Sequence, residues 1–214
     1  MHANMPISTV STIKTESKKR KPEPALDPMC MKRILKELVS CKQQDSRAEL
    51  GIQFDLVDDD NPLEWSAKWY YDMDADSEWA TETQKALARQ LKQRDLEYIE
   101  FRMVFPTTYP TEAPFVYNYY PRLVGSYIFG AGGLCAQTLS TEYGWSPASR
   151  ASYLMLTVRS LLENAGCRLQ RVECGHCSSR AMLEKPFDEA GARADFRAIS
   201  GLHSRGWSGS AGKS

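Results

Sequence analysis

Residues 98–120 read YIEFRMVFPTTYPTEAPFVYNYY and contain two segments of strand character separated by prolines. In residues 98–105 the more apolar side chains stand at every second position, which is typical of a half-buried strand. Three prolines then mark a loop rich in turns. Residues 115–120 are strongly aromatic and favour another strand. The stretch therefore predicts two strands joined by a proline-rich loop.

The region before this stretch predicts a helix, two further strands and a second helix. Apolar residues recur at helical spacing after the helix entry Asp27-Pro28, so we expect a helix that ends near residue 44. Residues 50–57 and 63–69 alternate apolar and polar side chains on either side of a turn. The second helix is expected from residue 74 to about 95.

The region after the stretch begins with a long, glycine-rich segment, residues 121–146, and continues with helices expected at 149–163 and 187–203. Strands followed by helices indicate an α+β fold, with an N-terminal helix, a four-stranded antiparallel meander and C-terminal helices. Loops of such length in a compact domain are usually functional or disordered. This one holds a lone cysteine, Cys135, among its glycines.

The composition is that of an ordinary globular protein, with 42% hydrophobic and 25% charged residues. Basic and acidic residues balance at 27 each, so nothing favours nucleic acid or an anionic membrane as a partner. No apolar run approaches the ~18 residues of a membrane span, and the N-terminal segment has no signal-peptide core. We therefore expect a cytoplasmic or nuclear protein whose six cysteines are reduced.

One folded domain is expected between two tails. Residues 1–26 are rich in Ser, Thr, Lys and Pro and cannot bury enough surface to offset their ordering entropy, so we expect a disordered tail. The folded domain spans residues 27–207, and residues 208–214 form a second flexible tail. The basic run at residues 18–21 is either a nuclear-import signal or a solvated part of the first tail.

Several segments together resemble the ubiquitin-conjugating enzyme family. Phe-Pro-Thr-Thr-Tyr-Pro at 105–110, with Ala-Pro-Phe-Val at 113–116, is similar to the proline-rich segment of that family. Gly-Leu-Cys at 133–135 is similar to its active-site segment, and Gly-Trp-Ser-Pro-Ala at 144–148 to the loop that follows the active site. The resemblance extends to the helix that ends near Leu162, and it implies a ubiquitin-conjugating (UBC-like) fold.

The Q-type branch of the family is the more similar one. Its features are a glycine-rich loop before the cysteine, an inserted helix between the second and third strands, and a Leu-His…Gly-Trp ending. They match residues 130–133, 76–95 and 202–207 of this chain. The resemblance covers residues 27–207 and leaves the tails outside.

The resemblance implies that Cys135 accepts ubiquitin from the activating enzyme as a thioester and passes it to a protein substrate. A cysteine suits this task because its sulfur is both a good nucleophile and a good leaving group. A lysine is the default acceptor, and the Q-type branch also permits Ser or Thr. Nothing basic flanks Cys135 in the sequence, so we expect an ordinary thiol. No cofactor is implied, because the activating enzyme uses the ATP.

The chain departs from the family pattern at two places. The usual His-Pro-Asn motif is replaced by Gly-Ser-Tyr at 125–127, and Tyr127 stands at the Asn position. Its hydroxyl either donates to the developing oxyanion or belongs to a packed loop aromatic. Residues 168–170 hold no counterpart of the carboxylate that many members place near the cysteine. His203 is a candidate base, with a structural histidine as the alternative, so the predicted catalytic residues are Cys135, Tyr127 and His203.

Family members contact their partners through the first helix and two loops. The resemblance assigns the activating enzyme to the first helix and a ubiquitin ligase to the loops, while Lys and Arg on the helix are equally consistent with a solvated face. The large apolar anchor of the first loop falls at Thr111, which offers little apolar area, so binding of the usual ligases is in question. The matching residues are Lys32, Arg33 and Lys36 on the helix, and Thr111, Glu112, Ala113, Pro147 and Ala148 in the loops.

Two other interpretations remain at this point. Cys167 and the segment Cys174-Gly175-His176-Cys177 offer sulfur and imidazole ligands, so the protein is alternatively a zinc-stabilised interaction protein. An ordinary cysteine-containing loop explains the same residues. A non-catalytic binding module would explain the missing His-Pro-Asn motif and carboxylate, but the retained Cys135 opposes it.

Overall fold

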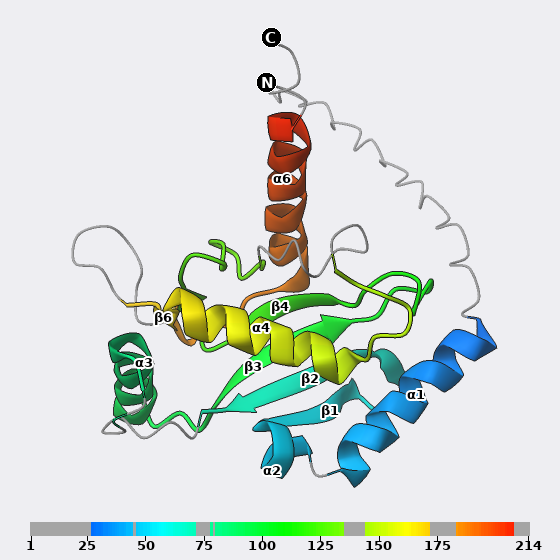
Figure 1. Cartoon of the computed structure of the whole chain (residues 1–214), viewed down its shortest axis with the longest axis horizontal. Helices are drawn as coiled ribbons and strands as arrows, with labels where there is room; N and C mark the ends of the chain where they lie inside the picture. The colour runs from blue at the N-terminus through cyan, green and yellow to red at the C-terminus, as the bar shows by residue number, and fades with distance from the viewer. Residues whose placement is uncertain are drawn as a thin grey trace, which may run out of the picture.

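A four-stranded antiparallel sheet forms the centre of the computed structural model, which describes residues 27–44, 46–71, 78, 80–134, 144–171 and 183–207 (Figure 1). The sheet order is β1-β2-β3-β4, so the strands form the meander that the sequence predicts. The described elements are α1 (Pro28–Gln43), α2 (Ser46–Leu50), β1 (Ile52–Asp58), β2 (Asn61–Tyr70), α3 (Glu82–Gln93), β3 (Tyr98–Val104), β4 (Phe115–Tyr120), β5 (Leu123–Val124), α4 (Ala151–Ala165), β6 (Arg168–Leu169) and α6 (Glu189–Trp207).

The buried face of the sheet follows from the alternation in its strands. Ile99, Phe101 and Met103 of β3 are fully buried, as the spacing of the apolar residues predicts. They lie opposite large side chains of β2, where Trp69 pairs with Ile99 and Trp65 with Met103. Since such cross-strand pairs stabilise a sheet, this face forms the centre of the core.

Two helices complete that core. α1 starts at Asp27, whose carboxylate accepts a hydrogen bond from the Met29 amide at 2.9 Å. α4 lies across the sheet and buries Leu154, Met155 and Val158 in the same cluster (Figure 1). α4 ends at Gly166, which has φ +68°, the left-handed conformation that glycine adopts without strain.

The inserted helix α3 is shorter than the sequence predicts, since it begins at Glu82 rather than near residue 74. The physical reason is the capping box at its start, where Thr81 accepts from the Gln84 amide and Gln84 accepts from the Thr81 amide. α3 packs beside β6, and the Gln90 side chain accepts from the Leu169 amide at 2.8 Å. Residues 72–77 and 79 lie outside the described part of the chain.

The long loop after β4 is more regular than expected. Within its described part, β5 pairs with β6, so that Leu123 lies opposite Leu169. The buried side chain of Asn118 fixes the turn that leads into it, because it donates to the Pro121 carbonyl at 3.0 Å and accepts from the Leu123 amide at 2.9 Å. Sequence periodicity could not show a two-residue strand whose partner is distant in the chain.

None of the described helices combines the length and apolar character needed to cross a membrane. The two expected tails, residues 1–26 and 208–214, lie outside the described residues, so their predicted disorder stays a prediction.

Candidate functional site

The glycine loop, which we define as residues 125–134, folds back on itself. Ile128 donates its amide proton to the Gly125 carbonyl at 3.2 Å, which closes a turn. An antiparallel bridge then pairs Ile128 with Leu134, and the Phe129 amide donates to the Gly133 carbonyl at 2.9 Å. The described chain reaches Leu134 in this paired arrangement, and Leu134 is buried.

The loop is also attached to the edge strand β4. Tyr117 forms an antiparallel bridge with Gly133, and the Asn118 amide donates to the Gly132 carbonyl at 3.0 Å. Gly132 has φ +86°, so a side chain at this position would be strained. The loop is therefore held in place by main-chain hydrogen bonds before it reaches the predicted active-site cysteine.

Cys135 directly follows Leu134 but lies outside the described residues, so the structure does not test its predicted role. Tyr127 is described and occupies the turn before Ile128, where 38% of its surface is exposed. Each partner of the Ile128–Leu134 bridge is thus the chain neighbour of a predicted site residue.

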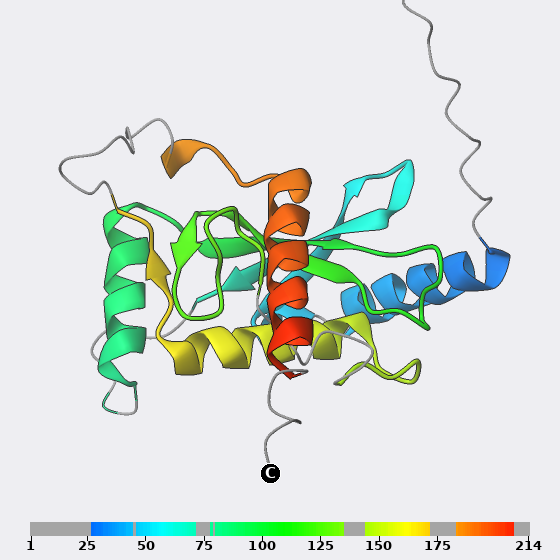
Figure 2. The same cartoon turned by 90° about the horizontal axis from the view of Figure 1, so that it is seen from above.

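The last helix, α6, lies beside the glycine loop (Figure 2). Asp188 accepts from the Gly191 amide at 2.8 Å in its first turn, and the Phe187 amide donates to the Tyr119 carbonyl at 3.0 Å. His203 belongs to the backbone of this helix, but its side chain is outside what the structure describes. Position 203 is eleven residues, about three turns, beyond the buried Ala192 and so lies on the same stripe of α6.

A carboxylate contacts the glycine loop from α6. Asp195 accepts a hydrogen bond from the Ala131 amide at 2.7 Å. Sequence reasoning missed this residue, since nothing near Asp195 in the chain distinguishes it from other helical acids. The segment at residues 168–170, where the family resemblance looks for a carboxylate, contains β6 instead.

The glycines of the loop serve internal packing more than the sequence suggests, since close approach of a ubiquitin tail was the expected reason for them. A Cβ atom on Gly132 would lie 2.6 Å from the Phe187 ring, and one on Gly133 would lie 2.8 Å from the Ala192 carbonyl oxygen. Only Gly130 of these three faces open space within 4 Å of that position.

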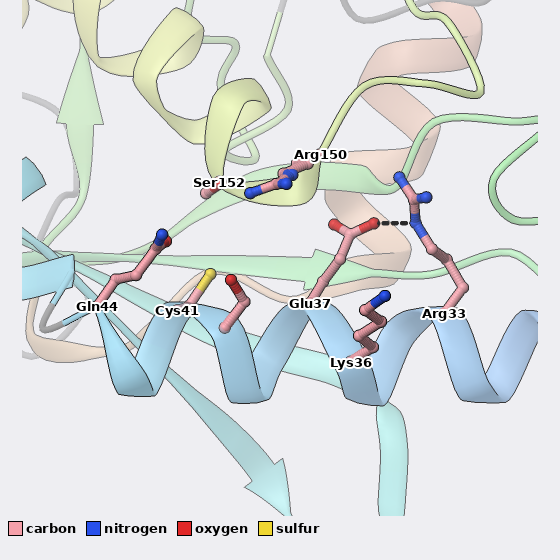
Figure 3. Close-up of a pocket in the computed structure, with 8 residues that line it drawn as sticks. Arg33, Lys36, Glu37, Cys41, Gln44, Arg150 and Ser152 are labelled. Atoms are coloured by element: carbon pink, nitrogen blue, oxygen red, sulfur yellow. Dashed lines mark hydrogen bonds and ion pairs between the residues drawn. The ribbon is translucent and has the colours of Figure 1, made fainter.

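The two predicted partner surfaces meet at Glu37, a buried residue of α1 (Figure 3). Its carboxylate accepts from the Arg33 guanidinium, from the Tyr109 hydroxyl at 2.8 Å and from the Ala151 amide at the start of α4 at 2.8 Å. Burial, and secondly the charge of Glu37, raises the pKa of Tyr109, so its hydroxyl keeps the donated proton. Glu37 thereby connects α1, the proline-rich loop and α4.

This arrangement divides the basic residues predicted to meet the activating enzyme. Lys32 and Lys36 are exposed, whereas Arg33 is half-buried and also donates to the Ser149 carbonyl at 3.2 Å. Arg33 thus serves the internal structure, and a shallow pocket of about 120 Å³ separates it from Arg150.

The two loops expected to meet a ligase pack on each other. Trp145 donates its indole proton to the Pro110 carbonyl at 2.7 Å, and its ring lies 5.9 Å from that of Tyr109. Thr111, Glu112, Pro147 and Ala148 are exposed, and Ala113 is half-buried.

Cys167, one of the proposed zinc ligands, is buried at the end of α4. Burial raises the pKa of its thiol to about 12, and Glu163 adds to the shift, so the neutral thiol is the stable form. Within the described ranges, no group of His, Cys, Asp and Glu is arranged to hold a metal ion. Cys174, His176 and Cys177 lie outside those ranges.

Solved structures of ubiquitin-conjugating enzymes align with part of the chain. Human ubiquitin-conjugating enzyme E2 G1 is 18% identical with a TM-score of 0.48, and the match covers 64% of this chain and 98% of that structure. A ubiquitin-conjugating enzyme from Plasmodium falciparum is 22% identical with a TM-score of 0.45, covering 63% and 98%. No protein-family model matches the chain.

Curated relatives cover more of the sequence. The chain is 26% identical over 169 residues to the Q-like protein 1 of the ubiquitin-conjugating enzymes of Homo sapiens, which covers 78% of this chain and 94% of that protein. It is 23% identical over 176 residues to ubiquitin-conjugating enzyme E2 25 of Caenorhabditis elegans, covering 82% and 42%. Human ubiquitin-conjugating enzyme E2 Q1 is 27% identical over 139 residues, covering 64% and 31%.

These relatives define the class of protein. The chain is a relative of the ubiquitin-conjugating enzymes and is classed with the ubiquitin transferases. Within that class it fits the Q-type branch, which confirms the resemblance stated from the sequence.

Proposed function

We propose that this protein is a ubiquitin-conjugating enzyme that carries ubiquitin as a thioester on Cys135. The observation that carries the proposal is the match over 94% of the length of the human Q-like protein 1. The described loop leads directly into the Gly-Leu-Cys segment. The activating enzyme, ubiquitin, a ligase and a protein substrate are the partners this function requires.

The chemistry is two acyl transfers. The Cys135 thiolate attacks the thioester carbonyl that joins ubiquitin to the activating enzyme, a new C–S bond forms, and the activating-enzyme thiolate leaves. An amine or hydroxyl of the substrate then attacks the new thioester and loses its proton, and Cys135 leaves as thiolate. No redox change occurs in either step.

Tyr127 and His203 are the proposed assistants of the second transfer. Tyr127 would donate its hydroxyl proton to the developing oxyanion, and His203 would take the proton of the attacking nucleophile. The support for Tyr127 is the Ile128–Leu134 bridge, which joins the two chain neighbours of Tyr127 and Cys135. The support for His203 is its place on the stripe of α6 that includes Ala192.

An assay with activating enzyme, ATP and ubiquitin tests the carrier step. On non-reducing gels, the unaltered chain is expected to form an adduct that thiol reductants remove. Cys135→Ser is expected to form an adduct that resists reductant, because an ester replaces the thioester. An adduct sensitive to reductant that persists in Cys135→Ala would refute the assignment.

Transfer from the charged protein to free lysine and free serine tests the two assistants and the acceptor. Tyr127→Phe and His203→Ala are expected to charge normally and to discharge roughly 100-fold more slowly. Discharge of both variants at the rate of the unaltered chain would leave Cys135 as a carrier without these assistants.

A further inference from the structure

The first turns of α6 are built to receive the glycine loop. A Cβ atom on Gly133 would lie 2.8 Å from the Ala192 carbonyl oxygen and 2.8 Å from the Asp195 Cβ. On the helix side, a Cβ atom on Gly191 would lie 3.1 Å from the Ala131 Cβ. The absence of side chains at both glycines therefore allows loop and helix to approach within van der Waals contact.

Asp195 adds a specific polar contact to this packing. Its carboxylate accepts from the Ala131 amide at 2.7 Å, a short distance that is typical of a charged acceptor. The two acids before it have other partners, since Asp188 accepts from the Gly191 amide and Glu189 pairs with Arg193. Asp195 is thus the described acid of α6 whose printed hydrogen bond crosses from the helix to the loop.

The contact acts on the segment that leads into the proposed nucleophile. Ala131 precedes Gly132 and Gly133, which are bound to β4, and Leu134 immediately precedes Cys135. A shift of the loop by as little as about 1 Å would misplace a reacting group enough to slow transfer by roughly 100-fold.

We propose that Asp195 is a positioning residue for ubiquitin transfer, which holds the glycine loop against α6 through its hydrogen bond to Ala131. The inference rests on the proposed function of Cys135. It makes α6 a structural part of the transfer site and assigns to this helix a carboxylate contact that residues 168–170 do not supply.

Single-turnover kinetics test the proposal on the full chain. Charging by the activating enzyme is measured first, and discharge is then followed against increasing concentrations of a small nucleophile that discharges the unaltered chain. Asp195→Ala is expected to charge within about twofold of the unaltered chain but to lower the maximal discharge rate about tenfold or more, with little change in the KM for the nucleophile.

Asp195→Asn separates positioning from charge. Its amide oxygen can accept the same hydrogen bond without a negative charge, so discharge is expected to return to within about threefold of the unaltered chain. Amide hydrogen exchange at Ala131 supplies a second reading, with protection lost in Asp195→Ala and kept in Asp195→Asn. Arg197→Ala, at an exposed position of α6, is the matched control and should leave both rates unchanged.

Three results would overturn the inference. They are normal discharge in Asp195→Ala, discharge in Asp195→Asn as slow as in Asp195→Ala, and unchanged Ala131 exchange in the alanine variant. If Asp195→Ala does not fold, Gly133→Ala tests the same contact from the loop, and normal discharge there contradicts the proposal. Absence of any adduct on the unaltered chain would instead refute both proposals.

Discussion

Glu37 shows at the scale of one residue how the partner surfaces are held together. Three donors from α1, the proline-rich loop and α4 converge on its carboxylate. The donated bonds compensate the charge for its loss of water. Removing the acceptor would leave these donors, two of them in buried bonds, without their partner.

Glu37→Ala is therefore expected to lower the free energy of unfolding by about 3 kcal/mol. Urea denaturation followed by fluorescence measures this change. Glu49→Ala, at an exposed position of α2, is the control and should change stability by less than about 0.5 kcal/mol. A cost for Glu37→Ala as small as the control would show that the three hydrogen bonds add nothing to stability.

Gly132 and Gly130 form a matched pair within the glycine loop. Gly132→Ala is expected to cost about 2 kcal/mol, because φ is +86° and the new Cβ would lie 2.7 Å from the Asn118 carbonyl oxygen. Gly130→Ala should stay within about 0.5 kcal/mol, since nothing lies within 4 Å of its Cβ position. Thermal and urea unfolding of the two variants compare them directly, and equal effects would contradict the description of the loop.

At the scale of the element, α3 depends on its cap and on its contact with β6. The capping box of Thr81 and Gln84 satisfies two amides at the start of the helix. Leu87 and Leu91 bury the apolar side of the helix, and Arg94 just past its end donates to the Gln170 carbonyl at 2.6 Å.

Thr81→Ala is expected to destabilise the protein by about 1 kcal/mol and to speed amide exchange at the start of α3. The reason is the loss of the side-chain acceptor for the Gln84 amide. Hydrogen exchange resolved by mass spectrometry reads the local effect. Thr107→Ala, at an exposed turn position, should leave exchange in α3 unchanged, and a similar change in both variants would argue against the cap.

At the scale of the whole molecule, buried thiols link stability to alkaline pH. Burial raises the pKa of Cys167 to about 12 from an ordinary 9.0, and it also raises the pKa of Cys30 and Cys41. A raised pKa means that the folded state favours the protonated thiol. Its contribution to stability is complete below about pH 9 and is lost as the pH rises toward 12.

The free energy of unfolding is therefore expected to fall above pH 9, by at most about 1.4 kcal/mol per pH unit for each thiol. Urea denaturation under reducing conditions from pH 7 to pH 11 measures this slope. Cys167→Ala should show a shallower slope than the unaltered chain. Parallel curves for the two proteins at all pH values would exclude a buried, neutral thiol at this position.

The sequence by itself determined the order of the elements and the class of protein. The alternation in β3 and the helical spacing in α1 report on burial directly, because a strand and a helix each expose one face at a fixed period. The motifs around residues 105–148 indicated the family, and the curated relatives confirm it.

Only the tertiary structure decided which distant residues meet. The pairing of β5 with β6, the three donors on Glu37 and the contact of Asp195 with Ala131 each join segments far apart in the chain. Local propensity carries no information about such contacts, since they depend on how the helices pack against the sheet. The same physical reason left Asp195 undetected in the sequence, and it explains why two of the loop's glycines serve contacts with Phe187 and α6.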